Sequence, residues 1–290
     1  PRLVHAASVA CADGDGGAPR VQRLADVTHV HNPSRVPPDV PLPASVLTPD
    51  VSRHVRLAEL ADTFGWPELT LPEWIAFAAT LDTPAWPAVA HAPASAERLL
   101  SVAAWAWGGL PAAQRARIAD ILAPVPCIPT RAGMRRPADA YFESVSLFPD
   151  LAVVALAQPV RGNLEKLLDA LHVRRHVDLQ LVFDRLVVAG DWSHVDLVDY
   201  LARTRALLSP DELERLARTP MLLDTHGHRA RPAELYEPRD ALHPLALRTL
   251  EWPRAWSPTS AEAALLHTLG LRQHPPLRTL LARAADHAHA

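Results

Sequence analysis

Apolar positions in the second half of this chain recur at helical spacing. Between 195 and 208 they form one apolar stripe, and Ser193 or Asp191 precedes it as a capping residue, so we predict a helix from 194 to about 207. The next motif, Ser209-Pro210-Asp211-Glu212, places a cap, a proline and two acidic residues in helix-starting order. It predicts a second helix to about residue 217.

A glycine-centred hairpin follows this helix pair, and its sequence occurs twice in the chain. Residues 126–141 are echoed by residues 220–236, with Gly133 matched to Gly227 and one residue inserted before the next proline. Further on, residues 167–176 return as residues 265–274. Self-similarity at a fixed period is typical of stacked or tandem architectures.

Both copies predict the same order of elements. In the first copy we expect helices over 95–108, 111–122, 163–171 and 177–188, with a hairpin around Gly133. In the second, Ser260 caps a helix over 261–269, Gly270 stops it, and a last helix runs from 275 to about 285. His172 stands where the second copy has Gly270, and histidine is among the residues enriched at positive φ.

The N-terminal part reads as the trailing half of an earlier copy. Residues 57–66 resemble the helix and glycine turn of the later copies, and a helix is expected over 71–81. Prolines crowd residues 32–49, which favours an extended or polyproline conformation, and they recur over 83–93. We therefore divide the chain into a proline-rich N-terminal segment (1–94), repeat one (95–188) and repeat two (189–290). The predicted fold class is α+β and helix-dominated, with tandem helix–helix–β-hairpin–helix–helix repeats similar to winged-helix units.

The composition argues against nucleic-acid-binding and membrane-bound classes of protein. The net charge of −3 leaves no overall basic footprint for nucleic acid or an anionic membrane, and no apolar stretch is long enough to span a bilayer. Cys11 and Cys127 are too few for a disulfide framework, which indicates a reducing compartment. We expect a cytoplasmic protein, with the nucleus as the alternative.

Short motifs in a specific order are Phe64–Trp74, Cys127–Thr130, Ala140–Phe142, Leu147–Leu151, Val177–Phe183, Trp192–His194 and Leu269–Arg272. They resemble large fungal proteins of unknown function built around a sacsin-like, GHKL-type ATPase domain, over most of the chain from about Leu24 to His287. The resemblance implies that this segment corresponds to the repeat region downstream of the ATPase domain. Nothing here matches the metal-binding asparagine or the glycine-rich lid of that domain, so no ATP-binding residue is carried over and no cofactor is expected.

Histidines and one Ser-His-x-Asp motif are the features that invite a catalytic or metal site. The chain has 15 histidines, and the His-x-His pairs are His29/His31, His226/His228 and His287/His289. A closed zinc site needs about four ligands, and no cysteine or carboxylate cluster completes one nearby. Ser193-His194-x-Asp196 contains the residue types of a triad, but such triads are assembled from separated segments, and Ser193 serves as a helix cap. We predict no catalytic, metal or cofactor residues.

The residues that we single out for partner contact lie in links and hairpins. Trp252 and Trp256 belong to a proline-rich link, and links run over protein surfaces. Arg229 and Arg231 flank the second hairpin, where arginines could contact phosphates. We expect a non-enzymatic, structural or client-binding region of a sacsin-like, chaperone-type protein, with protein partners and no membrane partner. The alternatives are a nucleic-acid-binding tandem winged-helix module and, third, a hydrolase.

Overall fold

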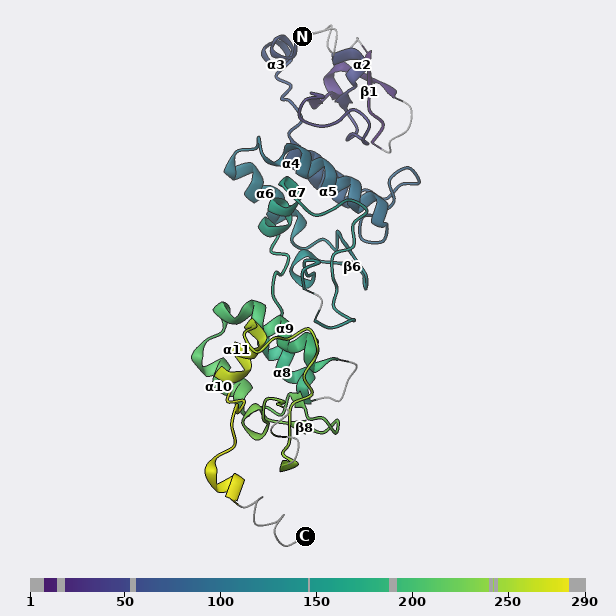
Figure 1. Ribbon diagram of the computed structural model, residues 1–290. Helices are drawn as coiled ribbons and strands as arrows, with labels where there is room; N and C mark the ends of the chain where they lie inside the picture. Colours follow the sequence, from purple (N-terminus) through teal and green to yellow (C-terminus); the bar gives the residue numbers. More distant parts are fainter. Residues whose placement is uncertain are drawn as a thin grey trace. The chain divides into compact units, whose positions relative to one another are not determined.

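The computed structural model describes residues 8–14, 19–52, 56–145, 147–187, 192–239, 242 and 245–281 (Figure 1). Two compact units divide the chain. The first unit contains Pro1–Ser146 and Asp150–Arg175, and the second contains Leu147–Pro149 and His176–Ala290. The described part of the chain is mixed α+β, dominated by helices with small sheets, which confirms the fold class at this level.

The first unit begins with a small sheet of four strands in the order β2-β1-β4-β3. The strands are β1 (Ser8–Cys11), β2 (Arg20–Arg23), β3 (His29–Val30) and β4 (Val46–Leu47). β1 is antiparallel to both β2 and β4, whereas β3 and β4 are parallel. The sequence analysis did not predict this sheet. The proline-dense segment supplies β4 because residues 44–48 contain no proline, so their backbone N–H groups can pair.

Helices and one hairpin make up the rest of the first unit. The helices are α2 (Pro49–Ser52), α3 (Leu57–Phe64), α4 (Leu71–Thr80), α5 (Pro93–Trp107), α6 (Ala112–Leu122) and α7 (Asn163–Ala170). Strands β5 (Ile128–Thr130) and β6 (Gly133–Arg135) form the predicted hairpin, and Gly133 has a φ of 90°. Proline at the first position of α5 starts that helix without a side-chain cap, because its missing N–H needs no partner there.

Helices α4, α5, α6 and α7 share one apolar core (Figure 1). Its largest fully buried side chains on these helices are Trp74, Ile75, Leu99, Leu100, Ile118, Leu122, Leu167 and Leu168. Burying each aliphatic side chain of this size stabilises the fold by about 1.5–3 kcal/mol. The predicted helices of this part are therefore held by mutual packing.

The second unit contains another set of helices and a shorter hairpin. Its elements are α8 (Leu179–Val187), α9 (His194–Thr204), α10 (Pro210–Arg218), β7 (Leu222–Leu223), β8 (Arg229–Ala230) and α11 (Ala261–Thr268). Ser193, Ser209 and Ser260 each accept a hydrogen bond from the first turn of the following helix, which confirms the three predicted caps. Helix α9 ends three residues earlier than predicted and continues as a 3₁₀ helix, Arg205–Leu207. Helix α8 groups with this unit, although the range predicted for repeat one extends through residue 188.

A parallel pairing ties the hairpin region of the first unit to the end of α7. Tyr141 pairs with Arg174 in parallel. The N–H of Phe142 donates to the Arg174 carbonyl at 3.0 Å, and the N–H of Arg174 donates to the Ala140 carbonyl at 2.9 Å. The Arg174 guanidinium lies 5.7 Å from the centre of the Tyr141 ring.

The same pairing occurs in the second unit at the end of α11. Tyr236 pairs with Arg272 in parallel, and the Arg272 guanidinium lies 5.8 Å from the Tyr236 ring centre. The N–H of Glu237 donates to the Arg272 carbonyl at 2.9 Å, and the N–H of Arg272 donates to the Leu235 carbonyl at 3.1 Å. In each unit a 3₁₀ turn, Pro137–Asp139 or Pro232–Glu234, precedes the paired tyrosine. Both units therefore attach the segment after this turn to the segment that follows a helix.

A left-handed residue ends each of these helices. His172 has a φ of 62° and Gly270 a φ of 102°, which confirms the positive φ expected at His172. The N–H of Val173 then donates to the Leu168 carbonyl at 3.0 Å, and the second unit closes its helix in the same way at 2.9 Å. This is the hydrogen bond of a Schellman-type helix end.

The leucines before these turns, Leu168, Leu171, Leu266 and Leu269, are buried as predicted. Replacing Leu269 with alanine should destabilise the second unit by about 2–5 kcal/mol, because the change leaves a cavity as well as losing buried apolar surface. Denaturant unfolding would measure this free energy. The same substitution at the exposed Leu207 is the control and should change it little. An unchanged midpoint in Leu269→Ala would contradict a core role.

Candidate interaction surface

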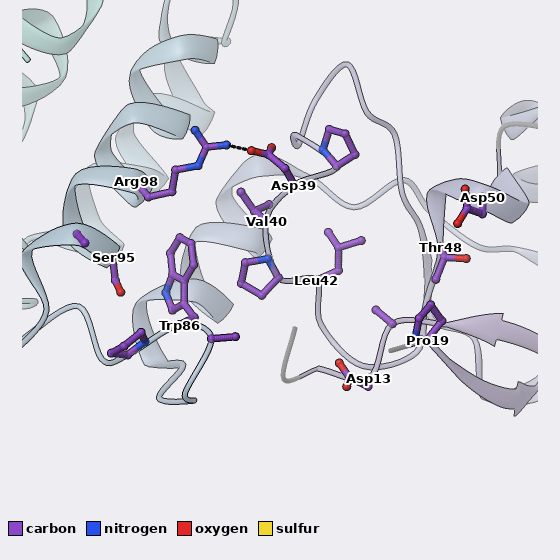
Figure 2. Close-up of a pocket in the computed structure, with 16 residues that line it drawn as sticks. Asp13, Pro19, Asp39, Val40, Leu42, Thr48, Asp50, Trp86, Ser95 and Arg98 are labelled. Atoms are coloured by element: carbon purple, nitrogen blue, oxygen red, sulfur yellow. Dashed lines mark hydrogen bonds and ion pairs between the residues drawn. The ribbon is translucent and has the colours of Figure 1, made fainter. Parts of the chain in front are cut away.

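A hollow of about 730 Å³ opens in the first unit between its two proline-rich segments (Figure 2). Its lining residues are Ala12, Asp13, Pro19, Pro38, Asp39, Val40, Pro41, Leu42, Thr48, Asp50, Ala85, Trp86, Pro87, Ala94, Ser95 and Arg98. They come from the ends of β1 and β2, the segment before β4, the residues just after β4 including α2, the link between α4 and α5, and the first turns of α5. The segments predicted as extended links therefore form walls of this hollow.

Two buried tryptophans hold these walls in place. The Trp74 indole N–H donates to the Pro41 carbonyl at 2.8 Å, which fastens the proline-rich segment to α4. The Trp86 indole N–H donates to the Ala78 carbonyl at 3.1 Å, which fastens the second link to the same helix. The two rings meet edge to face with centres 6.2 Å apart. Buried indoles with satisfied N–H groups make a rigid apolar wall.

Charged side chains surround this apolar wall. Arg98 on α5 forms an ion pair with Asp39 on the facing segment, drawn as a dashed line in Figure 2. Asp13 and Asp50 also line the hollow, so it presents three carboxylates and one guanidinium. The described lining thus combines apolar side chains with charged ones.

The tryptophans predicted for partner contact lie in the second unit, and one of them is buried. Trp256 is only 5% exposed, and its indole N–H donates to Asp199 Oδ1 at 2.7 Å. Trp252 donates to the Trp256 carbonyl at 2.9 Å, with the ring centres 5.6 Å apart. Trp256 is thus buried because this link folds back onto α9, and partner contact by Trp252 and Trp256 stays a prediction.

The two arginines of the second hairpin differ in their surroundings. Arg229 donates to the Leu186 carbonyl at 2.9 Å, and its guanidinium lies 5.1 Å from the Trp192 ring centre, so it attaches the hairpin to α8. Arg231 is exposed, and its backbone N–H donates to Glu234 Oε2 at 3.0 Å. The structure thus gives Arg229 an internal role that the sequence analysis did not predict.

Asp224 was not predicted, although it is the most elaborately bound carboxylate of the second unit. Its side chain is 2% exposed, and Oδ1 accepts the backbone N–H groups of His226 at 2.9 Å and His228 at 2.8 Å. Oδ2 accepts both Arg248 Nε at 3.0 Å and Nη2 at 2.9 Å. An aspartate two residues before a histidine and three before a glycine is a turn signal, but Arg248 is 24 residues away in sequence.

The environment of Asp224 favours its charged form. Burial by itself raises the pKa of Asp224, but the N–H of His228, the Arg248 guanidinium and the N–H of His226 outweigh it and hold the pKa below its usual range. Asp224 therefore clamps the hairpin to the segment that contains Arg248.

His31, His194 and Cys127 are engaged within the fold. His31 is buried, its Nε2 bonds the Val36 carbonyl at 2.8 Å, and burial lowers its pKa although that bond opposes the shift. Ser193 caps α9, and His194 Nε2 lies 3.3 Å from the Glu251 carbonyl. Burial raises the pKa of Cys127 to about 12, so its thiol is not ionised near neutral pH.

Within the described residues, no three His, Cys, Asp or Glu side chains are grouped to hold a metal ion. His287 and His289 lie outside those residues.

The Asp224 clamp predicts a pH-dependent stability. A carboxylate whose pKa is lowered by folding stabilises the fold above its unfolded pKa of about 3.9, and this contribution is lost as the pH falls through the folded pKa. Asp224→Asn should cost about 1–3 kcal/mol at pH 7 and flatten the stability profile below about pH 4. Unfolding titrations at several pH values would measure both effects. Asp120→Asn, at an exposed site on α6, is the control, and equal profiles for the two variants would contradict the clamp.

One family model matches this chain over residues 1–290, and its description is "Protein of unknown function (DUF3684)". No curated protein and no solved structure matches the chain. None of the described helices is both long enough and apolar enough to cross a membrane.

Proposed function

The chain belongs to the DUF3684 family of proteins of unknown function, and we propose that it is a non-catalytic region that binds polypeptide. The observation that carries this proposal is the hollow beside Trp86, whose two proline-rich walls are fastened to α4. Its volume lies within the usual range of ligand pockets, about 300–1,000 Å³. Apolar walls with an acidic rim favour a segment that alternates apolar and basic side chains.

We further propose that the region belongs to a large sacsin-like, chaperone-type protein and works in the cytoplasm. Support comes from the order of the short motifs and from the arrangement of the hollow, which is lined by links rather than by a reactive cluster. A chaperone-type role needs apolar surface that is held open, and the bonds of Trp74 and Trp86 would keep this surface in place.

A tandem arrangement of the two units is part of the proposal, with Gly133 matched to Gly227 and Leu171 to Leu269. The recurring pairings of Tyr141 with Arg174 and of Tyr236 with Arg272 support it. The units would then serve as a scaffold that spaces binding surfaces along the chain.

The hollow can be tested by filling it from its exposed edge. Ala85 and Ala94 line it and are exposed, so Ala85→Arg with Ala94→Arg adds bulk and positive charge without removing a core side chain. We expect the full chain to bind a fluorescent peptide of alternating leucine and arginine, and the double variant to bind it at least about tenfold more weakly. Fluorescence anisotropy would measure the dissociation constants.

Two controls make this experiment specific. Ala113→Arg with Ala206→Arg adds the same charge at exposed positions outside the hollow and should leave binding within about twofold of the original. A peptide with glutamate in place of arginine should bind more weakly to the unaltered chain. Equal losses in both double variants would refute a binding role for the hollow.

The winged-helix alternative makes a different prediction. We expect no tight, salt-sensitive complex with duplex DNA, because the net charge is −3 and Arg229 is engaged by Leu186 and Trp192. Anisotropy with labelled DNA at low and moderate salt would measure this. A complex that weakens steeply with salt and is lost in Arg229→Ala with Arg231→Ala would replace the polypeptide proposal with nucleic-acid binding.

A further inference from the structure

The helical segment at the end of the described chain, residues 277–281, exposes two large apolar side chains. Leu277 is 71% exposed and Leu281 is 62% exposed. They are four residues apart, so they lie on the same side of a helix. Within the described residues nothing covers this apolar edge.

Helix α8 occupies the corresponding place after the first turn and is covered. Leu179 follows Leu171 by eight residues (171 to 179), as Leu277 follows Leu269 (269 to 277). By the same count Phe183 corresponds to Leu281, yet Phe183 is only 5% exposed. The side chain at this position is thus buried in the helix after the His172 turn and exposed in the helix after the Gly270 turn.

The second unit holds α8 through specific contacts. The Arg215 guanidinium of α10 lies 3.7 Å from the centre of the Phe183 ring, and Arg215 Nη1 donates to Gln180 Oε1 at 3.0 Å. Arg229 of β8 donates to the Leu186 carbonyl. Helix α10 and the β7–β8 hairpin therefore form a surface on which α8 packs. We call such a surface a seat for the helix that follows the preceding left-handed turn.

The first unit has a seat of the same kind. Helix α4 follows the left-handed Gly65 and packs its buried Trp74 and Ile75 into the core that α5 and α6 share. Two of the three helices that follow such a turn are thus seated in a helix pair. The third, at residues 277–281, presents the same kind of apolar edge without a seat among the described residues.

We infer that residues 277–281 are the docking helix for a further unit of the same helix–helix–hairpin architecture, supplied from outside these 290 residues. The inference rests on the proposed tandem arrangement. The partner is not a second copy of this chain, because α4 and α8 already occupy the seats of the two units.

The positive charge of Arg278 indicates which kind of residue the partner should carry at the contact. Arg278 stands where α8 has Gln180, the residue that accepts from Arg215. An arginine at the partner's equivalent of Arg215 would repel Arg278, whereas a carboxylate would attract it. We therefore expect the docking unit to carry an acidic residue at that position.

A chain with one added unit tests the inference. Residues 188–281 are appended after Ala285. The added copy then follows the helix at 277–281 as residue 188 onward follows α8. This added copy carries Arg215→Glu. Hydrogen exchange of the amides of residues 277–281 is measured by mass spectrometry. We expect at least about tenfold slower exchange than in the original chain. This protection should be lost in Leu277→Asp with Leu281→Asp and retained in the control Leu207→Asp, which alters an exposed leucine elsewhere.

A second extended chain separates the two possible failures. In it, residues 178–187 replace residues 276–285, so that the known seat residues face an added copy with its natural Arg215. If the α8 replacement is protected but residues 277–281 of the first extended chain are not, the docking inference is wrong and the tandem arrangement stands. If the α8 replacement is also unprotected, the tandem arrangement itself is wrong. A third extended chain keeps residues 276–285 and appends the copy with natural Arg215, and stronger protection there than with Arg215→Glu would overturn the predicted acidic partner residue.

Discussion

The parallel pairing after each left-handed turn is the constraint on which both units depend. It joins Tyr141 to Arg174 and Tyr236 to Arg272, and in each unit the preceding helix ends in a residue with positive φ. His172 and Gly270 meet this condition by different means, since glycine adopts such a φ at no steric cost and histidine at a modest one. Once the pairing is made, the hairpin, the 3₁₀ turn and the end of the helix are fixed relative to one another within a unit.

The two hairpins are closed by different side chains. Thr130 and Asp224 both pair antiparallel with the strand segment that follows, at Val154 and Leu250. Thr130 closes its turn with a neutral hydroxyl that donates to the Gly133 carbonyl, whereas Asp224 uses a buried carboxylate. The second hairpin therefore depends on a charge and the first does not. This difference makes acid sensitivity of the hairpin a property of the second unit.

The feature on which the proposed function rests lies in the links between helices and strands. The hollow beside Trp86 is walled by proline-rich segments, which donate few backbone hydrogen bonds and so leave apolar surface accessible. The buried thiol of Cys127, the cap at Ser193 and the enclosed His31 each have a structural role. The proposed binding role therefore rests on the hollow beside Trp86.

Local sequence determined the elements whose causes are local. Serine caps at 193, 209 and 260, the glycine hairpins and the positive φ at His172 all depend on residues within a few positions of one another. Tertiary structure decided what depends on distant partners. Cys11 meets Leu47 in a sheet, Arg248 reaches Asp224 across 24 residues, and the Trp256 link folds onto Asp199. No periodicity encodes these contacts, because each arises only when separate segments pack and must satisfy their buried polar groups.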